Sequence, residues 1–262
     1  MKTIRFRILT AIAAAAAHAD FSYITVSKTP AGERTSKHFI KGQKSIADDG
    51  STVAIMDFDA QTLTTIDKTR KTYTVKPFSE LAGKAAPAGA NIHTDVRKTG
   101  QHKTIGGFDT EETVMTVSVD NSRSKQPGSQ GQMQMEFDVW AASDVPGIEE
   151  MRAFYRRNAD RMPWAAMAGG NSGMAEIQRL MATAQGIPVF TTVKTKITNE
   201  RMLAQIEQMK KMGGQQAALA DKLLAQMGGA GPSISGESSG FSASPAPDSV
   251  FAIPPDYQKV ER

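Results

Sequence analysis

The chain has 262 residues, of which 40% are hydrophobic and 22% charged, a composition typical of a soluble globular protein. It contains no cysteine, which excludes disulfides, cysteine-ligated zinc and a thiol nucleophile. The formal net charge is +4, from 31 basic and 27 acidic residues. Three of the basic residues, Lys2, Arg5 and Arg7, lie in an N-terminal segment that we expect to be removed; the remaining charge of about +1 does not indicate nucleic-acid binding.

Residues 1–19 have the organisation of a signal peptide. A basic stretch, MKTIRFR, precedes an apolar run, ILTAIAAAAA, and the small residues Ala17 and Ala19 occupy the −3 and −1 positions of a cleavage site. The apolar run is too short for a permanent membrane span, and no later stretch reaches about 20 apolar residues. We therefore expect cleavage after Ala19 and a soluble, periplasmic or secreted mature protein.

The first part of the mature chain reads as successive strands. Segments rich in β-branched and aromatic residues are separated by turn signals such as Asp49-Gly50, which suits the positive φ angles of a tight hairpin turn. The pattern predicts an antiparallel meander. Its expected strands cover residues 20–28, 35–47, 51–59, 61–67 and 71–78.

Four further strands are predicted in the middle of the chain. Residues 95–105 and 108–120 flank Gly106-Gly107 and form a predicted hairpin. In residues 132–140, QMQMEFDVW, apolar side chains alternate with polar ones, so this strand is expected to have one dry face. Residues 186–199 return to the same alternation.

Helices are expected only after Trp140, at about 145–184 and again at 200–227. Asp144 is a candidate N-cap for a first helix, and a second is expected to start at Ser172. Residues 200–227 are rich in Met, Ala and Gln and are interrupted by Gly213-Gly214, which predicts an insertion of two helical pieces. Residues 228–247 are dominated by Gly, Ser and Pro and predict a flexible linker. Residues 248–262 are expected to complete the sheet with a short strand, around Val250, Phe251 and Ile253.

Motifs for catalysis are weak, and we expect the protein not to be an enzyme. Residues 236–240, GESSG, match the nucleophile-elbow pattern, but that motif needs a strand before it and a helix after it, and here it falls in the predicted linker. Asp109, Glu111 and Glu112 follow a hairpin turn and are expected to be solvated. No phosphate-binding glycine motif is present, and no cofactor is expected.

Six blocks of sequence, in order, resemble an exported bacterial family of unknown function. They are DFSY, FIKGQK, STVAIMDFDAQTLTTIDKTRKTYTV, TGQHKTIGGFDTEETVMTV, FDVWAASDVPG and VFAIPPDY, and they cover most of 20–199 plus 248–257. That family is similar in architecture to the periplasmic lipoprotein carriers and receptors of the LolA/LolB type. The resemblance implies a mainly β fold with inserted helices (α+β), in which a curved antiparallel sheet or half-barrel has helices over its concave face. Residues 200–247 depart from the carrier pattern.

The resemblance implies binding of a hydrophobic ligand or a lipidated partner, such as a lipid, an acyl chain or a lipoprotein. The candidate lining residues are apolar side chains of the dry strand faces and of the predicted helices: Met115, Val117, Met133, Met135, Phe137, Val139, Met151, Phe154, Met174, Ile177 and Met181. Flexible methionine suits a variable chain, although methionine at these spacings is also ordinary core.

Two other hypotheses also rely on methionines. An interaction module would expose a stripe of Met202, Ile206 and Met209 to another envelope protein. A Cu(I) site would use neighbouring thioethers, such as Met133 with Met135 or Met209 with Met212. A carrier should keep an apolar space beside Phe137, whereas an interaction module should pack that face solid.

Overall fold

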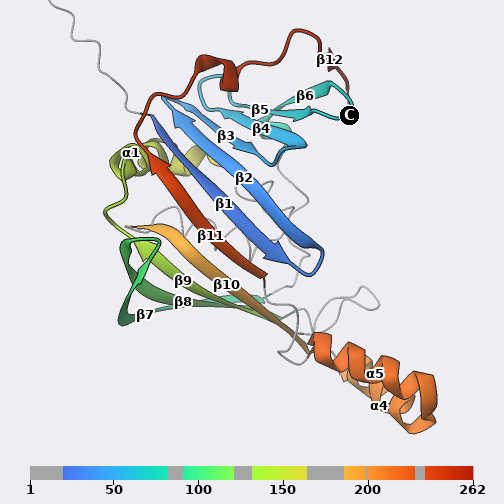
Figure 1. The fold of residues 1–262 in the computed structure, drawn as a ribbon. Helices are drawn as coiled ribbons and strands as arrows, with labels where there is room; N and C mark the ends of the chain where they lie inside the picture. The colour runs from blue at the N-terminus through green and yellow to red at the C-terminus, as the bar shows by residue number, and fades with distance from the viewer. Residues whose placement is uncertain are drawn as a thin grey trace, which may run out of the picture.

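The computed structural model describes residues 20–81, 91–120, 132–163, 186–198, 200–227 and 234–261. Within these ranges the protein is mainly β, with a single largely antiparallel sheet of 12 strands and three α-helices (Figure 1). No helix in the described ranges is long and apolar enough to cross a membrane.

The strands, in chain order, are β1 (Phe21–Thr29), β2 (Gly32–Lys41), β3 (Lys44–Asp48), β4 (Thr52–Asp57), β5 (Thr62–Asp67), β6 (Thr72–Pro77), β7 (Asn91–Ile105), β8 (Phe108–Asp120), β9 (Gln132–Ala142), β10 (Ile187–Thr198), β11 (Ile234–Ser242) and β12 (Gln258–Lys259). The helices are α1 (Ile148–Asn158), α4 (Glu200–Met212) and α5 (Gly214–Met227). Across the sheet the strands follow the order β12-β6-β5-β4-β3-β2-β1-β11-β10-β9-β8-β7. Two meanders, β1–β6 and β7–β10, are thus joined through β11.

The meander has one more strand than its sequence pattern predicts. The expected strand at 35–47 is divided into β2 and β3 by a turn at Gly42, where φ is +57°. The apolar alternation continues on both sides of this turn, which is why the pattern looked continuous. The other predicted strands match β1, β4 to β6 and β7 to β10 closely.

The prediction of a flexible linker at 228–247 is wrong for residues 234–242. This Gly/Ser-rich segment is β11, which pairs antiparallel with β1 on one side and with β10 on the other. Its composition gives little intrinsic preference for a strand, so the pairing with both neighbours must hold it. The GESSG motif lies wholly inside this strand, and the Ser238 hydroxyl is 3.3 Å from the hydroxyl of Thr25 on β1.

The sheet is open and not strongly curled, so the half-barrel that the resemblance implied is corrected to an open twisted sheet. Closure would need its two edge strands to pair with each other. One edge strand is β12, which has only two residues and pairs in parallel with β6. The other, β7, carries lysines and an irregularity between Lys98 and His102, features that discourage edge pairing.

Helix α1 packs on one face of the sheet, hereafter the α1 face. Its buried residues Met151 and Phe154 contact a core that includes Phe21 and Ile40 of β1 and β2 (Figure 1). Asp144 does not cap this helix: the N-cap is Gly147, with φ +82° and no side-chain cap. A Cβ on Gly147 would come 3.0 Å from the Phe21 ring, so glycine is needed there both for its φ and for its small size.

The opposite face of the β3–β6 region is covered by the C-terminal segment. Residues 248–251 form a 3-10 helix rather than the expected strand, and the C-terminal strand is β12. Apolar side chains of this segment pack on a buried cluster of the sheet. The cluster contains Ile46, Val53, Ile55 and Ile66, with Val250, Phe251, Ile253 and Tyr257 against it. Ion pairs fix the segment at both ends, Lys41 with Asp248 at 2.7 Å and Lys71 with Asp256 at 2.8 Å.

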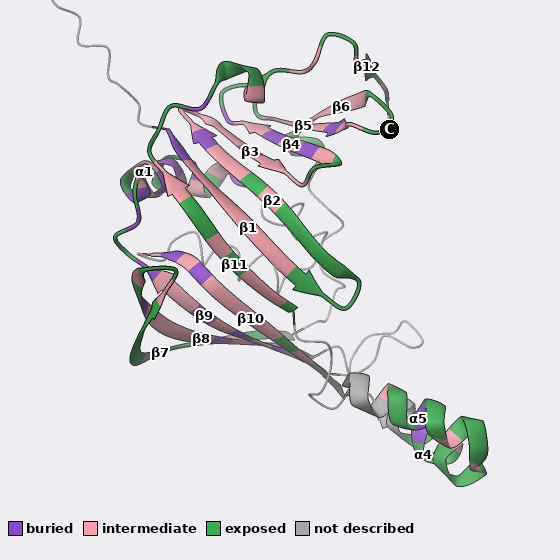
Figure 2. Cartoon of the chain, viewed as in Figure 1, coloured by how far each residue is buried: buried purple, intermediate pink, exposed green. Residues whose placement is uncertain are grey.

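Helices α4 and α5 pack on each other and extend away from the sheet beyond the end of β10 (Figure 1). The predicted break at Gly213-Gly214 is confirmed, since α4 ends at Met212 and α5 begins at Gly214. Both helices are largely exposed (Figure 2). The helical insertion therefore does not cover the sheet. The second helix predicted from Ser172 lies outside the described residues.

Candidate functional site

The predicted lining residues of β8 and β9 share one face of the sheet. Met115 pairs with Phe137 and Val117 with Met135, and these four side chains are at most 5% exposed. They form a cluster with Val119 and Val139. The alternation in the sequence therefore placed these side chains together correctly. Phe137 is 3% exposed and lines neither of the grooves described below, so among the described residues the apolar space that a carrier was expected to keep beside it is not found there. Contact of these residues with a ligand stays a prediction.

The structure divides the remaining candidate residues. Met151 and Phe154 belong to α1 and to a separate cluster, where Phe154 packs against Phe58 with ring centroids 5.3 Å apart. Met174, Ile177 and Met181 lie outside the described residues, as does the side chain of Met133. The candidate set thus contributes to two apolar clusters rather than to one.

Both clusters lie on the α1 face. Direct strand pairing carries this face from Val139 through Thr191 of β10 and Gly236 of β11 to Ser27 of β1. Tyr23, Thr25 and Ser27 alternate along β1 and therefore share its α1 face. From Tyr23 a second row of paired residues crosses the other meander. That row consists of Tyr23, His38, Ala47, Ala54, Thr65 and Thr74.

A group of aromatic rings that no sequence pattern indicated packs against the α1 core. Tyr23 stacks on His38 with ring centroids 4.4 Å apart, and Phe241 of β11 stacks on Tyr23 at 6.0 Å. Phe108, the first residue of β8, meets Phe241 edge to face at 5.4 Å. These residues come from segments far apart in sequence, and Phe241 falls in the segment predicted as a linker, so no local pattern indicated their meeting.

Burial keeps the ionisable members of this group uncharged near neutral pH. It lowers the pKa of His38 to about 4, because the positive imidazolium is poorly solvated there. Burial also raises the pKa of Tyr23, with a further contribution from Tyr155 of α1, and raises that of Tyr155. The core beneath α1 is therefore neutral and largely aromatic.

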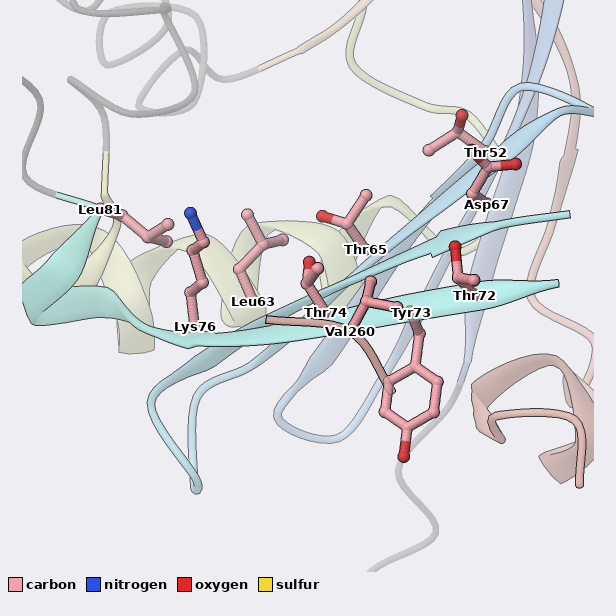
Figure 3. Close-up of a pocket in the computed structure, with 10 residues that line it drawn as sticks. All are labelled: Thr52, Leu63, Thr65, Asp67, Thr72, Tyr73, Thr74, Lys76, Leu81 and Val260. Atoms are coloured by element: carbon pink, nitrogen blue, oxygen red, sulfur yellow. The ribbon is translucent and has the colours of Figure 1, made fainter. Parts of the chain in front are cut away.

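A groove of about 410 Å³ opens on the same face near the edge of the sheet (Figure 3). It is lined by Thr52, Leu63, Thr65, Asp67, Thr72, Tyr73, Thr74, Lys76, Leu81 and Val260. Leu63 pairs with Met56, which packs against the α1 core, so groove and core are neighbours on one surface. The volume lies within the range of about 300–1,000 Å³ that is usual for small-molecule sites.

The groove has a charged residue towards each end (Figure 3). Asp67 lies 3.7 Å from the Nε atom of Arg70 and accepts the backbone N–H of Arg70 at 2.9 Å. Lys76 lies beside Leu63 and Leu81. In the part of the chain that the structure describes, Lys76 has neither a hydrogen bond nor an ion pair from its side chain.

A second groove, of about 260 Å³, lies on the opposite face beneath the C-terminal segment. Phe39, Ile46 and Tyr257 contribute to its wall, and Lys68 closes one side by an ion pair with Asp48 at 2.7 Å. It is separated from the predicted lining residues by the sheet itself. We therefore take the groove on the α1 face as the candidate site.

The remaining sequence candidates have structural partners. Asp109 lies 3.2 Å from the His102 ring and Glu111 lies 3.5 Å from the Lys98 ammonium, each pair bridging β7 and β8. No group of three or more His, Asp or Glu side chains in the described ranges is arranged to hold a metal ion.

The predicted interaction stripe lies partly inside the helical hairpin. Ile206 is only 1% exposed and packs against Ala220, with Met209 half-buried beside them. The side chain of Met202 lies outside the described residues. The expectation that this stripe faces a partner is therefore corrected for Ile206. The hairpin instead exposes Met212 and Leu219, at 60% and 51%.

No protein-family model matches the chain, and no curated protein shows significant sequence similarity to it.

Proposed function

We propose that this protein is an exported, periplasmic, non-enzymatic binding protein that captures or carries a hydrophobic ligand or a lipidated partner. The observation that carries the proposal is the continuity of the α1 face. The apolar rows of β8 and β9, the aromatic group beside α1 and the groove between Leu63 and Val260 all lie on this one face. The apolar rows are already buried inside the protein, so the groove is the part of this face that is open to a ligand. Burying an apolar chain there contributes about 25 cal/mol per Å².

The signal-peptide pattern of residues 1–19 supports the proposed location. Two parts of the proposal come from the resemblance to the lipoprotein carriers. One is the arrangement of a sheet with a helix over one face, and the other is the class of ligand. The closed half-barrel is not part of it. In the groove the chain would lie across threonine methyl groups and against Leu63 and Leu81.

The test is equilibrium titration with an acyl-chain fluorescent probe. Thr65→Trp places a large side chain in the groove, whereas Thr116→Trp makes the same change on the opposite face of β8. We expect the wild type and Thr116→Trp to bind the probe and Thr65→Trp to bind at least tenfold more weakly. Equal affinities for the three proteins, all folded by circular dichroism, would refute the assignment of this groove.

A second candidate function is an envelope interaction module without a ligand cavity. The observation that favours it is the exposure of Met212 and Leu219 on a hairpin that projects from the sheet (Figure 2). Photo-crosslinking groups at position 219 and, as the control, at the exposed position 237 of β11 separate the two functions in living cells. One discrete crosslinked product from 219 alone would favour the interaction module.

A further inference from the structure

The two ends of the groove differ in how their charges are balanced. Asp67 already has a cation, Arg70, and a backbone N–H. Lys76 has no acidic partner among the described residues, and its cross-strand neighbour is the apolar Leu63. Asp67 cannot reach it, since Leu63 and Asp67 are four residues apart on one strand, or about 13 Å. Within the described ranges, this end of the groove therefore carries a positive charge that no acidic side chain offsets.

The wall between the two charged ends suits a chain rather than a ring. Thr65 and Thr74 pair directly across β5 and β6 in the middle of the groove, each presenting a methyl and a hydroxyl group. The Tyr73 ring points away from these side chains, so none of the residues drawn in Figure 3 stacks an aromatic platform inside the groove. A sugar ring would lack the flat apolar surface on which such ligands are commonly stacked.

We propose that the groove selects a single-chain anionic amphiphile, with Lys76 binding its head group and the threonine-lined wall receiving the start of its chain. This inference rests on the proposed function and adds the head-group chemistry to it. The ammonium donates hydrogen bonds to a carboxylate or phosphate oxygen, and such charge-assisted bonds are stronger than neutral ones. The long Lys76 side chain can pack its methylene groups against Leu63 while its ammonium faces the head group.

The experiment compares three ligands with the same chain, dodecanoate, dodecyl phosphate and 1-dodecanol, by isothermal titration calorimetry. The test variant is Lys76→Gln, and the matched control is Lys259→Gln, which removes one exposed lysine from the adjacent strand β12. We expect the wild type to bind an anionic ligand about tenfold more tightly than the alcohol. Lys76→Gln should lose that preference and Lys259→Gln should keep it.

The outcomes separate this inference from the proposed function. Equal affinity of the wild type for anions and alcohol, or an unchanged preference in Lys76→Gln, overturns the head-group assignment and leaves hydrophobic binding standing. Failure to bind all three ligands overturns the proposed function together with this inference. A tenfold preference for dodecyl phosphate over dodecanoate supports the proposal and assigns the head group to a lipid phosphate. The reverse preference also supports the proposal and assigns the head group to the carboxylate of a free fatty acid.

Discussion

Replacing Glu237 by proline should strongly destabilise the protein, because this residue lies in the strand that joins the two meanders. Glu237 pairs with Val26 of β1 and with Phe190 of β10. Because β11 has a strand on each side, the backbone N–H of Glu237 points towards one of these two strands. Proline has no N–H, and its ring does not fit in the middle of a sheet.

The expected loss is about 3 kcal/mol or more in the free energy of unfolding. The ladder hydrogen bond contributes a net of about 1 kcal/mol, and leaving its carbonyl acceptor without a donor costs a further 1–3 kcal/mol or so. The control is Glu237→Thr at the same position. Because the Glu237 side chain is exposed, this change should shift stability by no more than about 0.5 kcal/mol.

Urea denaturation followed by far-ultraviolet circular dichroism measures both variants. With a slope near 3 kcal/mol per molar urea, the midpoint of Glu237→Pro should fall by about 1 M relative to Glu237→Thr. A flexible linker would tolerate proline without loss. Equal midpoints for the two variants would therefore refute the placement of β11 in the centre of the sheet.

Three further predictions concern the core under α1 and its pH dependence, and urea denaturation measures each. Phe154→Ala should cost about 3–5 kcal/mol, since Phe154 is fully buried, and a loss below 1 kcal/mol would contradict its packing. Gly147→Ala should lower the free energy of unfolding more than Gly50→Ala does. Both glycines have positive φ, but only a Cβ at position 147 would meet the Phe21 ring. Equal losses of stability in the two variants would argue against that contact. Because the folded pKa of His38, about 4, lies below the unfolded value of about 6.5, stability should be full above pH 6.5. It should fall by up to about 3 kcal/mol as the pH drops towards 4, while His38→Phe should lose less; identical pH profiles would contradict the burial of His38.

Local pattern predicted most of the strands because their apolar residues alternate. The faces of β8 and β9, with Met115, Val117, Met135 and Phe137, followed directly from period two. Turn chemistry located several hairpins, such as the one at Gly106-Gly107, where φ is positive at both residues. It missed the turn at Gly42, where strong alternation continues on both sides.

Long-range pairing could not be predicted in this way. Strand β11 has few apolar residues, and its place between β1 and β10 depends on partners about 40 to 220 residues away in the chain. The groove has the same origin, since its wall combines β4, β5 and β6 with Val260 of the C-terminal segment. Thr72, Thr74 and Lys76 alternate along β6, but on β5 the groove is lined by Leu63, Thr65 and Asp67, and this mixed pattern gave no sign of a site.

The most direct test of the central claim is native mass spectrometry of the protein purified from the periplasm of cells that express the full chain, followed by solvent extraction and lipid analysis. The proposed function predicts a bound, extractable, acyl-bearing species in a fixed ratio to the protein, and its loss in Thr65→Trp. A ligand-free mass that stays unchanged when fatty acid or lipopeptide is offered would contradict it.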